Sequence, residues 1–172
     1  CIRDRNNCYL RFEGTVAGAI PIFALFRNCL RGDRIEGIAG ILNGTTNYIL
    51  SKMHFEGVSF ELALKEAQER GIAETDPTYD IDAIDPAIKT VILANTLLGK
   101  KATFKEVERR GIRKITHEAI TLAKRSGYTI KLLCLIDELV VEPRLIPLNH
   151  PLCVHGTLNA IHIKTDLARE IT

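Results

Sequence analysis

The chain has 172 residues, of which 46% are hydrophobic and 26% charged, and its 23 basic and 21 acidic side chains leave a net charge of +2. Such a balanced composition is typical of a globular domain and gives no electrostatic footprint for nucleic acid or an anionic membrane. No apolar segment approaches the roughly 18 residues that span a bilayer, and the first residues do not resemble a signal peptide. We therefore expect one cytoplasmic domain with no nucleic-acid or membrane partner.

The cysteines and histidines do not form a recognisable framework. The five cysteines are odd in number, lie far apart and lack Cys-x-x-Cys spacing, so we expect reduced packing residues and neither disulfides nor a zinc site. They are Cys1, Cys8, Cys29, Cys134 and Cys153. The five histidines are equally scattered, and we expect no metal site from them.

No segment of the sequence predicts a nucleotide-phosphate loop. Neither Gly-x-Gly-x-x-Gly after a strand nor Gly-x-x-x-x-Gly-Lys-Ser/Thr occurs, so we do not expect the chain to hold a nucleotide cofactor alone. Because the first residue is not methionine and the last ones, 165–172, stop in mid-pattern, we expect residues 1–172 to be one domain from a longer polypeptide.

The first predicted elements are a short strand over residues 8–12 and an apolar helix that begins with Thr15 as its N-cap and runs to about Leu30. Small residues at 17–19 leave the first turn of this helix bare. A ligand phosphate or another backbone could approach the free amides there, and tight packing of the helix against the sheet explains the small residues equally well.

A buried strand is predicted over residues 35–42, and a polar turn, residues 43–47, leads from it into the next helix. Strand-to-helix turns at the end of a sheet are favoured positions for ligand sites. Asn-Gly and Thr-Thr are also ordinary turn and cap chemistry, so this segment alone does not establish a site.

The most informative stretch is the acidic segment 71–89, which follows a helix predicted over residues 59–70. It contains five carboxylates and two prolines, so we expect mostly loop, with a helix that starts at Asp85 as N-cap and Pro86 at the first helical position. Lys89 follows Asp85 by four residues, which places both side chains in one small space. The carboxylates are Glu74, Asp76, Asp80, Asp82 and Asp85.

Two interpretations of this segment remain open on composition alone. Asp-rich loops are common solvated connectors, and an Asp/Lys pair one turn apart is commonly a surface ion pair worth roughly 0.3–0.5 kcal/mol. The functional alternative is a pocket whose carboxylates bind a cationic amino group while the lysine handles a proton or orients a polar oxygen.

The rest of the chain completes the fold prediction. Short helices are predicted over residues 104–110 and 116–126, and strands over 129–137, 139–145 and 154–164. We expect an α+β fold in which one mixed β-sheet carries helices layered mainly on one face. The other face would be solvated or paired with a second subunit.

Two segments, Gly40–Leu50 and Ala73–Lys89, closely resemble the catalytic region of homoserine dehydrogenase. Residues 13–21, 156–161 and 165–168 are also similar to that family, so the resemblance covers nearly the whole chain. It implies an oxidoreductase that interconverts L-homoserine and L-aspartate 4-semialdehyde with NAD or NADP. This reaction lies on the biosynthetic route to threonine, methionine and isoleucine.

The resemblance also implies roles for individual residues. Glu74 and Asp85 would hold the substrate amino group, and Lys89 would exchange a proton with the hydroxyl or aldehyde oxygen. Asp80 would orient Lys89 or a bound water, while Thr45 and Thr46 would line the same cleft. Gly71 matches a position close to the nicotinamide. The family has a site for a monovalent cation, usually described as sodium. By this resemblance, its ligands would be the main-chain carbonyls of Glu13, Val16, Gly18 and Ile20.

The sequence departs from the family in one large and several small ways. The amino-terminal Rossmann half, with its glycine-rich fingerprint and a further active-site lysine, is absent, so we expect the isolated chain to be a substrate-binding and dimerisation region without turnover. Locally, Ala83 replaces a frequent glycine, Ile72 a frequent aromatic residue and Pro86 a frequent small residue.

A non-enzymatic amino-acid-binding or dimerisation module is an alternative to the enzyme. A sibling dehydrogenase acting on another small amino or hydroxy acid is a second one. The retained Glu74, Asp85 and Lys89 argue against the sibling.

Overall fold

The computed structural model describes residues 5, 6, 8 and 10–172. Its sheet has six strands in the order β2-β4-β3-β1-β5-β6. The strands are β1 (Ile35–Ile41), β2 (Glu108–Arg109), β3 (Tyr128–Leu135), β4 (Val140–Pro147), β5 (Ala160–Thr165) and β6 (Glu170–Ile171). The helices are α2 (Ile22–Cys29), α3 (Gly44–Glu56), α4 (Phe60–Glu69), α5 (Thr78–Ile81), α6 (Ile84–Leu97), α7 (His117–Arg125) and the 3-10 turn η1 (Phe104–Glu106).

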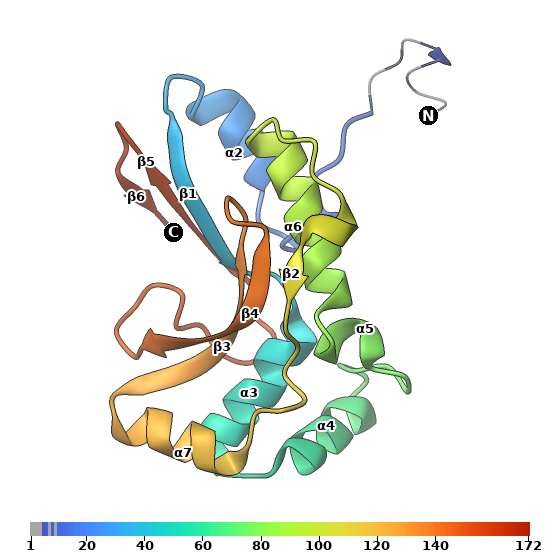
Figure 1. Ribbon diagram of the computed structural model, residues 1–172, viewed down its shortest axis with the longest axis vertical. Coiled ribbons are helices and arrows are strands. Elements are labelled where there is room, and N and C mark those ends of the chain that lie inside the picture. Colours follow the sequence, from blue (N-terminus) through green and yellow to red (C-terminus); the bar gives the residue numbers. More distant parts are fainter. Residues whose placement is uncertain (1–4, 7, 9) are drawn as a thin grey trace.

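The sheet is mixed, because β2 runs parallel to β4 while all the other neighbouring strands are antiparallel. Figure 1 shows α3, α5 and α6 together on one side of the sheet, where the larger hydrophobic cluster lies. A smaller cluster on the other side packs Leu152 and Cys153, from the connection between β4 and β5, against Ile41 and Leu133. The predicted α+β fold with helices mainly on one face is confirmed.

Several predicted boundaries were wrong. Residues 8 and 10–12 form no strand, and Tyr9 lies outside the described residues. The strand expected from residue 154 begins only at Ala160, because the preceding residues form turns over α3. The segment 104–110 is divided into η1 and β2, and the short strand β6 was not predicted.

Helix α2 begins at Ile22 and not at Thr15. Ala17 and Gly18 have left-handed backbones with φ values of 62° and 58°, which a right-handed helix cannot contain. The carboxylate of Glu13 takes over the capping function that was assigned to Thr15. It accepts hydrogen bonds from the amides of Phe23 at 2.7 Å and Ala24 at 3.1 Å, two of the donors that a helix start leaves unpaired.

The start of α6 also differs from the prediction. The N-cap is Ala83, with a left-handed φ of 60°, and Asp85 lies inside the first turn. A left-handed backbone is strained for alanine but not for glycine. This explains why the resembled family frequently has glycine where this chain has Ala83. Pro86 stands at the third helical position, where its missing amide hydrogen is still tolerated.

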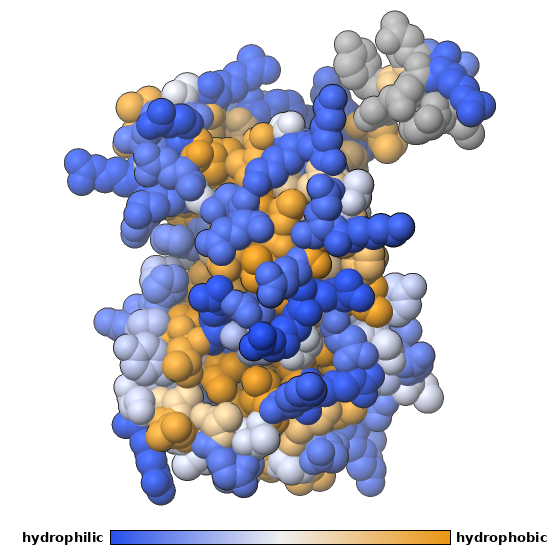
Figure 2. Space-filling view, in the orientation of Figure 1, coloured by the Kyte–Doolittle hydropathy of each residue, from blue (hydrophilic) through white to orange (hydrophobic). Residues whose placement is uncertain are grey.

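The surface combines charged side chains with a hydrophobic groove. Figure 2 shows hydrophobic side chains exposed in the lower part of this face, where α7 lies in Figure 1. Leu122, Tyr128 and Leu145 line a groove of about 400 Å³ between α7 and the strands β3 and β4. Among the described residues, no helix is long and apolar enough to cross a membrane.

The cysteines divide into two groups. Cys134 is buried and Cys153 is partly buried, as expected of packing residues, whereas Cys8 and Cys29 are exposed, so the packing prediction was wrong for these two. Cys1 lies outside the described residues. The four described cysteines are all free thiols.

Candidate active site

The site is built around the turn that joins β1 to α3. Asn43 caps α3, and its side-chain oxygen accepts hydrogen bonds from the amide and the hydroxyl of Thr46 at 2.9 and 3.0 Å. A Cβ atom at Gly44 would lie 2.9 Å from the carbonyl oxygen of Thr157, which a real side chain could not tolerate. Glycine therefore allows the segment before β5 to close one side of the site.

The acidic segment is fixed to the rest of the fold at its middle. The amide of Ile112 donates to the carbonyl of Ile81 at 2.8 Å, and a Cβ at Gly111 would collide with the backbone of Ile81 and Asp82. Arg113 forms a two-pronged ion pair with Asp82. This anchoring places the carboxylates that flank α5 at defined positions.

The five carboxylates of the segment divide by their contacts. Asp76 accepts bonds from the amide and hydroxyl of Thr78, which starts α5, and hydrogen bonding to Thr78 lowers the pKa of Asp76 below its usual value. Asp82 is bound by Arg113. The other three line an open pocket of about 500 Å³ together with Lys89. The complete lining is Asn43, Gly44, Thr45, Ile72, Glu74, Asp80, Asp85, Lys89 and Thr157.

Lys89 is held by two acceptors at the floor of this pocket. Its Nζ lies 2.8 Å from Oδ2 of Asp85 and donates to the carbonyl of Leu42 at 2.9 Å. The Lys89 side chain is only 22% exposed. An ammonium group has three hydrogens, so one remains for a ligand oxygen. A solvated surface pair would have neither the main-chain acceptor nor the two further carboxylates beside it.

A buried thiol lies directly behind the pocket. Cys134 on β3 contacts the carbonyl of Pro86 at 3.8 Å. Burial raises the pKa of the Cys134 thiol to about 12, so it stays protonated and unreactive at neutral pH. Cys134 is therefore a packing residue of the core and offers no nucleophile to the pocket.

The two threonines occupy different positions. Thr45 lines the pocket, and its hydroxyl donates to the carbonyl of Ile72 at 3.0 Å. Thr46 is 1% exposed and lies behind the pocket, where it orients Asn43. Gly71 is not among the lining residues. It is exposed, has a φ of 69° and directly precedes Ile72, with no neighbouring atom where a side chain would stand.

The four candidate cation ligands lie in the loop before α2. A Cβ at Gly14 would be 3.8 Å from the carbonyl oxygen of Gly18, so the loop folds back on itself. The carbonyl of Ile20 already accepts from the amide of Ile22 at 2.8 Å and keeps one lone pair. The Glu13 carboxylate is used in capping α2, so only the main-chain oxygen of this residue is considered as a ligand. Carbonyl oxygens of this kind fit a hard cation.

Sequence reasoning assigned no role to Asn43 or Thr157, although both line the pocket. The polar turn and the family-like segment 156–161 were the available signals. Thr157 could not be placed from the sequence. It lies beside Asn43 because β5 pairs with β1, although more than a hundred residues separate Thr157 from Asn43 along the chain.

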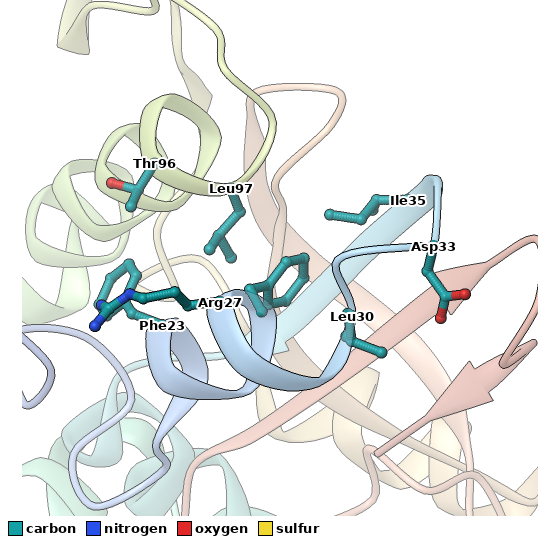
Figure 3. Close-up of a pocket in the computed structure, with 8 residues that line it drawn as sticks. Phe23, Arg27, Leu30, Asp33, Ile35, Thr96 and Leu97 are labelled. Atoms are coloured by element: carbon teal, nitrogen blue, oxygen red, sulfur yellow. The ribbon is translucent and has the colours of Figure 1, made fainter.

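A second pocket, of about 360 Å³, lies between α2, the turn before β1 and the end of α6. Figure 3 shows Arg27 and Asp33 at opposite ends of it, with Leu97 between them. It contains none of the predicted site residues and has no converging charges. The acidic pocket gathers the predicted carboxylates, Thr45 and Lys89, and is for that reason the candidate active site.

Comparison with known proteins shows the family. The family model described as homoserine dehydrogenase matches residues 21–172. A homoserine dehydrogenase from Methanocaldococcus jannaschii is 53% identical over 97% of this chain and 50% of its own length. The crystal structure of a homoserine dehydrogenase from Thiobacillus denitrificans is 39% identical, with a TM-score of 0.92 over 98% of this chain and 41% of that one.

A hyperthermophilic archaeal homoserine dehydrogenase in complex with NADPH is 32% identical, with a TM-score of 0.80 over 98% of this chain and 50% of that one. The chain thus spans about half the length, or less, of these relatives. The family match, the sequence identity and the shared fold show that the chain belongs to the homoserine dehydrogenase family.

Proposed function

We propose that this chain is the substrate-binding and catalytic region of an NAD(P)-dependent oxidoreductase that interconverts L-homoserine and L-aspartate 4-semialdehyde. The observation that supports this most directly is the convergence of Glu74, Asp80 and Asp85 with Lys89 in one pocket. An amino acid with an ammonium group and a side-chain oxygen matches this arrangement, because it needs anionic acceptors for one end and a proton donor for the other.

In the proposed complex, Glu74 and Asp85 accept hydrogen bonds from the substrate ammonium. The remaining hydrogen of Lys89 is directed at the substrate oxygen. During reduction of the aldehyde, Lys89 donates a proton to this oxygen as negative charge develops on it, and during oxidation a neutral Lys89 takes the hydroxyl proton. Asp80 lies beside Asp85 and would orient Lys89 or a bound water.

NAD or NADP, when bound, supplies or accepts the hydride. Among this chain's residues, Gly71 would lie near the nicotinamide, since it is exposed beside Ile72 and offers open space where a side chain would stand. Thr45 borders the same side of the pocket. The cofactor would be held mainly by residues outside this chain, and we propose that residues 1–172 alone bind substrate without turnover.

A monovalent cation such as sodium would be held by the main-chain carbonyls of Glu13, Val16, Gly18 and Ile20. The folded-back loop and the remaining lone pair of Ile20 support this assignment.

We further propose a cytoplasmic homodimer that acts in threonine, methionine and isoleucine biosynthesis. The exposed groove around Leu122 and Leu145 supports an association surface, because contiguous apolar surface of this kind favours contact with a partner. Sedimentation of the chain at micromolar concentration tests the dimer, and a monomer would refute it. The alternative of a non-enzymatic module is not favoured, since the matched relatives are named as dehydrogenases.

The function is tested by calorimetric titration of L-homoserine into the chain and its Asp85→Ala variant. We expect binding that Asp85→Ala abolishes and that Glu69→Ala, a change of an exposed carboxylate on α4, leaves intact. Equal binding by all three proteins would refute the proposed pocket. If none binds, the same variants are compared in the full-length polypeptide by oxidation of L-homoserine with each cofactor, and an inactive wild type would refute the function.

A further inference from the structure

Asp80 and Asp85 approach each other from different elements, and one uncharged side chain lies between them. Nδ2 of Asn43 donates to Oδ1 of Asp80 at 2.6 Å and to Oδ2 of Asp85 at 2.9 Å. Two carboxylates that share a small, partly buried space repel each other. The two hydrogens of one amide satisfy both of them without adding a charge.

The orientation of this amide is determined by its other end. Oδ1 of Asn43 accepts from the main-chain amide of Thr46 at 2.9 Å and from its hydroxyl at 3.0 Å. The side-chain nitrogen of Asn43 thus faces only acceptors, and its side-chain oxygen faces only donors. If the two were exchanged, the oxygen would face the carboxylates of Asp80 and Asp85, acceptor against acceptor. Asn43 is only 6% exposed, so water does not readily replace these partners.

The same contacts determine which carboxylate oxygens remain for a substrate. Oδ2 of Asp85 is used by Asn43 and by Lys89, which lies 2.8 Å from it. Among the described residues, no hydrogen bond uses Oδ1 of Asp85 or Oδ2 of Asp80. Each carboxylate thus presents one oxygen with spare acceptor capacity.

From this geometry we propose that Asn43 is a positioning residue for the reaction: it fixes Asp80 and Asp85 as a pair and thereby the place of Lys89 and of the substrate ammonium. This inference deepens the proposed function and rests on it. Asn43 acts through the carboxylates and does not itself exchange the proton.

The sharpest variant is Asn43→Asp in the full-length polypeptide. Aspartate has nearly the same shape and is an equally good helix N-cap, so the start of α3 is retained, but it donates no amide hydrogen and adds a third carboxylate. We expect a fall of about 100-fold in kcat/KM, with a raised KM for L-homoserine and a lowered kcat, as displacement of catalytic groups produces.

Asn95→Asp is the matched control. Asn95 lies on α6, and its amide also donates at one end and accepts at the other, in both cases with Ala102, away from the pocket. We expect unchanged kinetics for this variant. Thr46→Val, which removes one donor to Asn43, should change KM and kcat in the same direction as Asn43→Asp but less.

The outcomes separate the two proposals. If the wild type turns over L-homoserine and a folded Asn43→Asp variant does so equally well, the positioning role is overturned and the function stands. If the wild type is inactive with L-homoserine, the function fails. The side-chain amide signals of Asn43, followed by NMR in the Asp80→Asn and Asp85→Asn variants, then test the bridge between the two carboxylates separately: both substitutions must shift the signals, and unchanged signals overturn the bridge and the positioning role with it.

Discussion

The ammonium nitrogen of Lys89 lies 2.8 Å from Oδ2 of Asp85, the residue one helical turn before it on α6. Because both side chains belong to one helix, their separation does not depend on any loop. The proposed proton-handling group and one proposed anchor for the substrate ammonium are thus a single structural unit.

Replacing Lys89 by methionine keeps most of the side-chain volume and removes the proton. In the full-length polypeptide, we expect turnover of L-homoserine to fall by roughly 10²- to 10⁴-fold, the usual contribution of a positioned acid–base group. Steady-state kinetics in both directions measures it. Lys65→Met, at an exposed position of α4, should retain wild-type rates. A Lys89→Met variant within a factor of two of wild type would contradict the assignment.

Gly111→Ala should displace the acidic segment. The added methyl group would collide with main-chain atoms of Ile81 and Asp82, and these cannot move aside as a flexible side chain could. We expect a loss of about 1–3 kcal/mol in the free energy of unfolding, measured by urea denaturation. Gly32→Ala, where no atom lies within 4 Å, is the control and should change stability little. Equal stability of the two variants would show that the contact is not rigid.

The substitution Glu13→Ala distinguishes the role of the Glu13 carboxylate, which caps α2, from the role of its main-chain carbonyl, which it leaves in place. Loss of the cap on α2 should lower the free energy of unfolding by about 1 kcal/mol. If the cation is bound by main-chain oxygen, the gain in thermal stability on adding sodium in place of a bulky organic cation should persist in this variant. Unchanged stability of the variant would contradict the capping role of the Glu13 carboxylate. Loss of the stabilisation by sodium would contradict binding of the cation by main-chain oxygen. Glu36→Ala, an exposed change on β1, serves as the control.

Lys131 should make stability depend on pH. It is fully buried, and its Nζ donates to Asn47 and Ser51 with no carboxylate at hydrogen-bonding distance among the described residues. Burial lowers the pKa of Lys131 from 10.5 to about 8. Between these values the unfolded chain holds a proton that the folded chain has released, so the free energy of unfolding rises with pH.

We expect a gain of about 1 kcal/mol between about pH 8 and pH 9, measured by urea denaturation and absent from Lys131→Met. Two neighbouring histidines do not contribute to the change in stability between about pH 8 and pH 9, since burial lowers the pKa values of His54 and His155 below the usual histidine value. The raised pKa of Cys134 acts in the opposite direction above about pH 9, and the comparison of the two proteins removes it. Equal pH profiles would contradict the prediction.

Much of the fold could be predicted because its signals are local. The period of the apolar residues identified α4 and α7. In the structure the hydroxyls of Ser59 and Thr116 cap these two helices by accepting main-chain amide hydrogen bonds. The errors came from backbone conformations that composition does not reveal. Left-handed residues at Ala17 and Ala83 moved the starts of α2 and α6, because alanine normally favours the helix that it interrupts here.

The candidate site shows the same division. Asp85 and Lys89 could be paired from their spacing on one helix. Whether Asp76 and Asp82 belonged to the pocket could not be decided, because their partners, Thr78 and Arg113, become visible only in three dimensions. The bridge made by Asn43 depends on contacts with Asp80 and Asp85, which follow it by 37 and 42 positions. The period of the apolar residues gives no information about contacts over such separations.

One wall of the pocket belongs to the centre of the sheet. Asn43 follows β1 and Thr157 precedes β5, and these two strands are paired from Ile41 and Ala160 at one end to Ile35 and Thr165 at the other. Opening the pocket on this side requires breaking that ladder, so its amides should exchange with deuterium only through large-scale unfolding. We therefore expect this wall to persist about as long as the folded molecule itself.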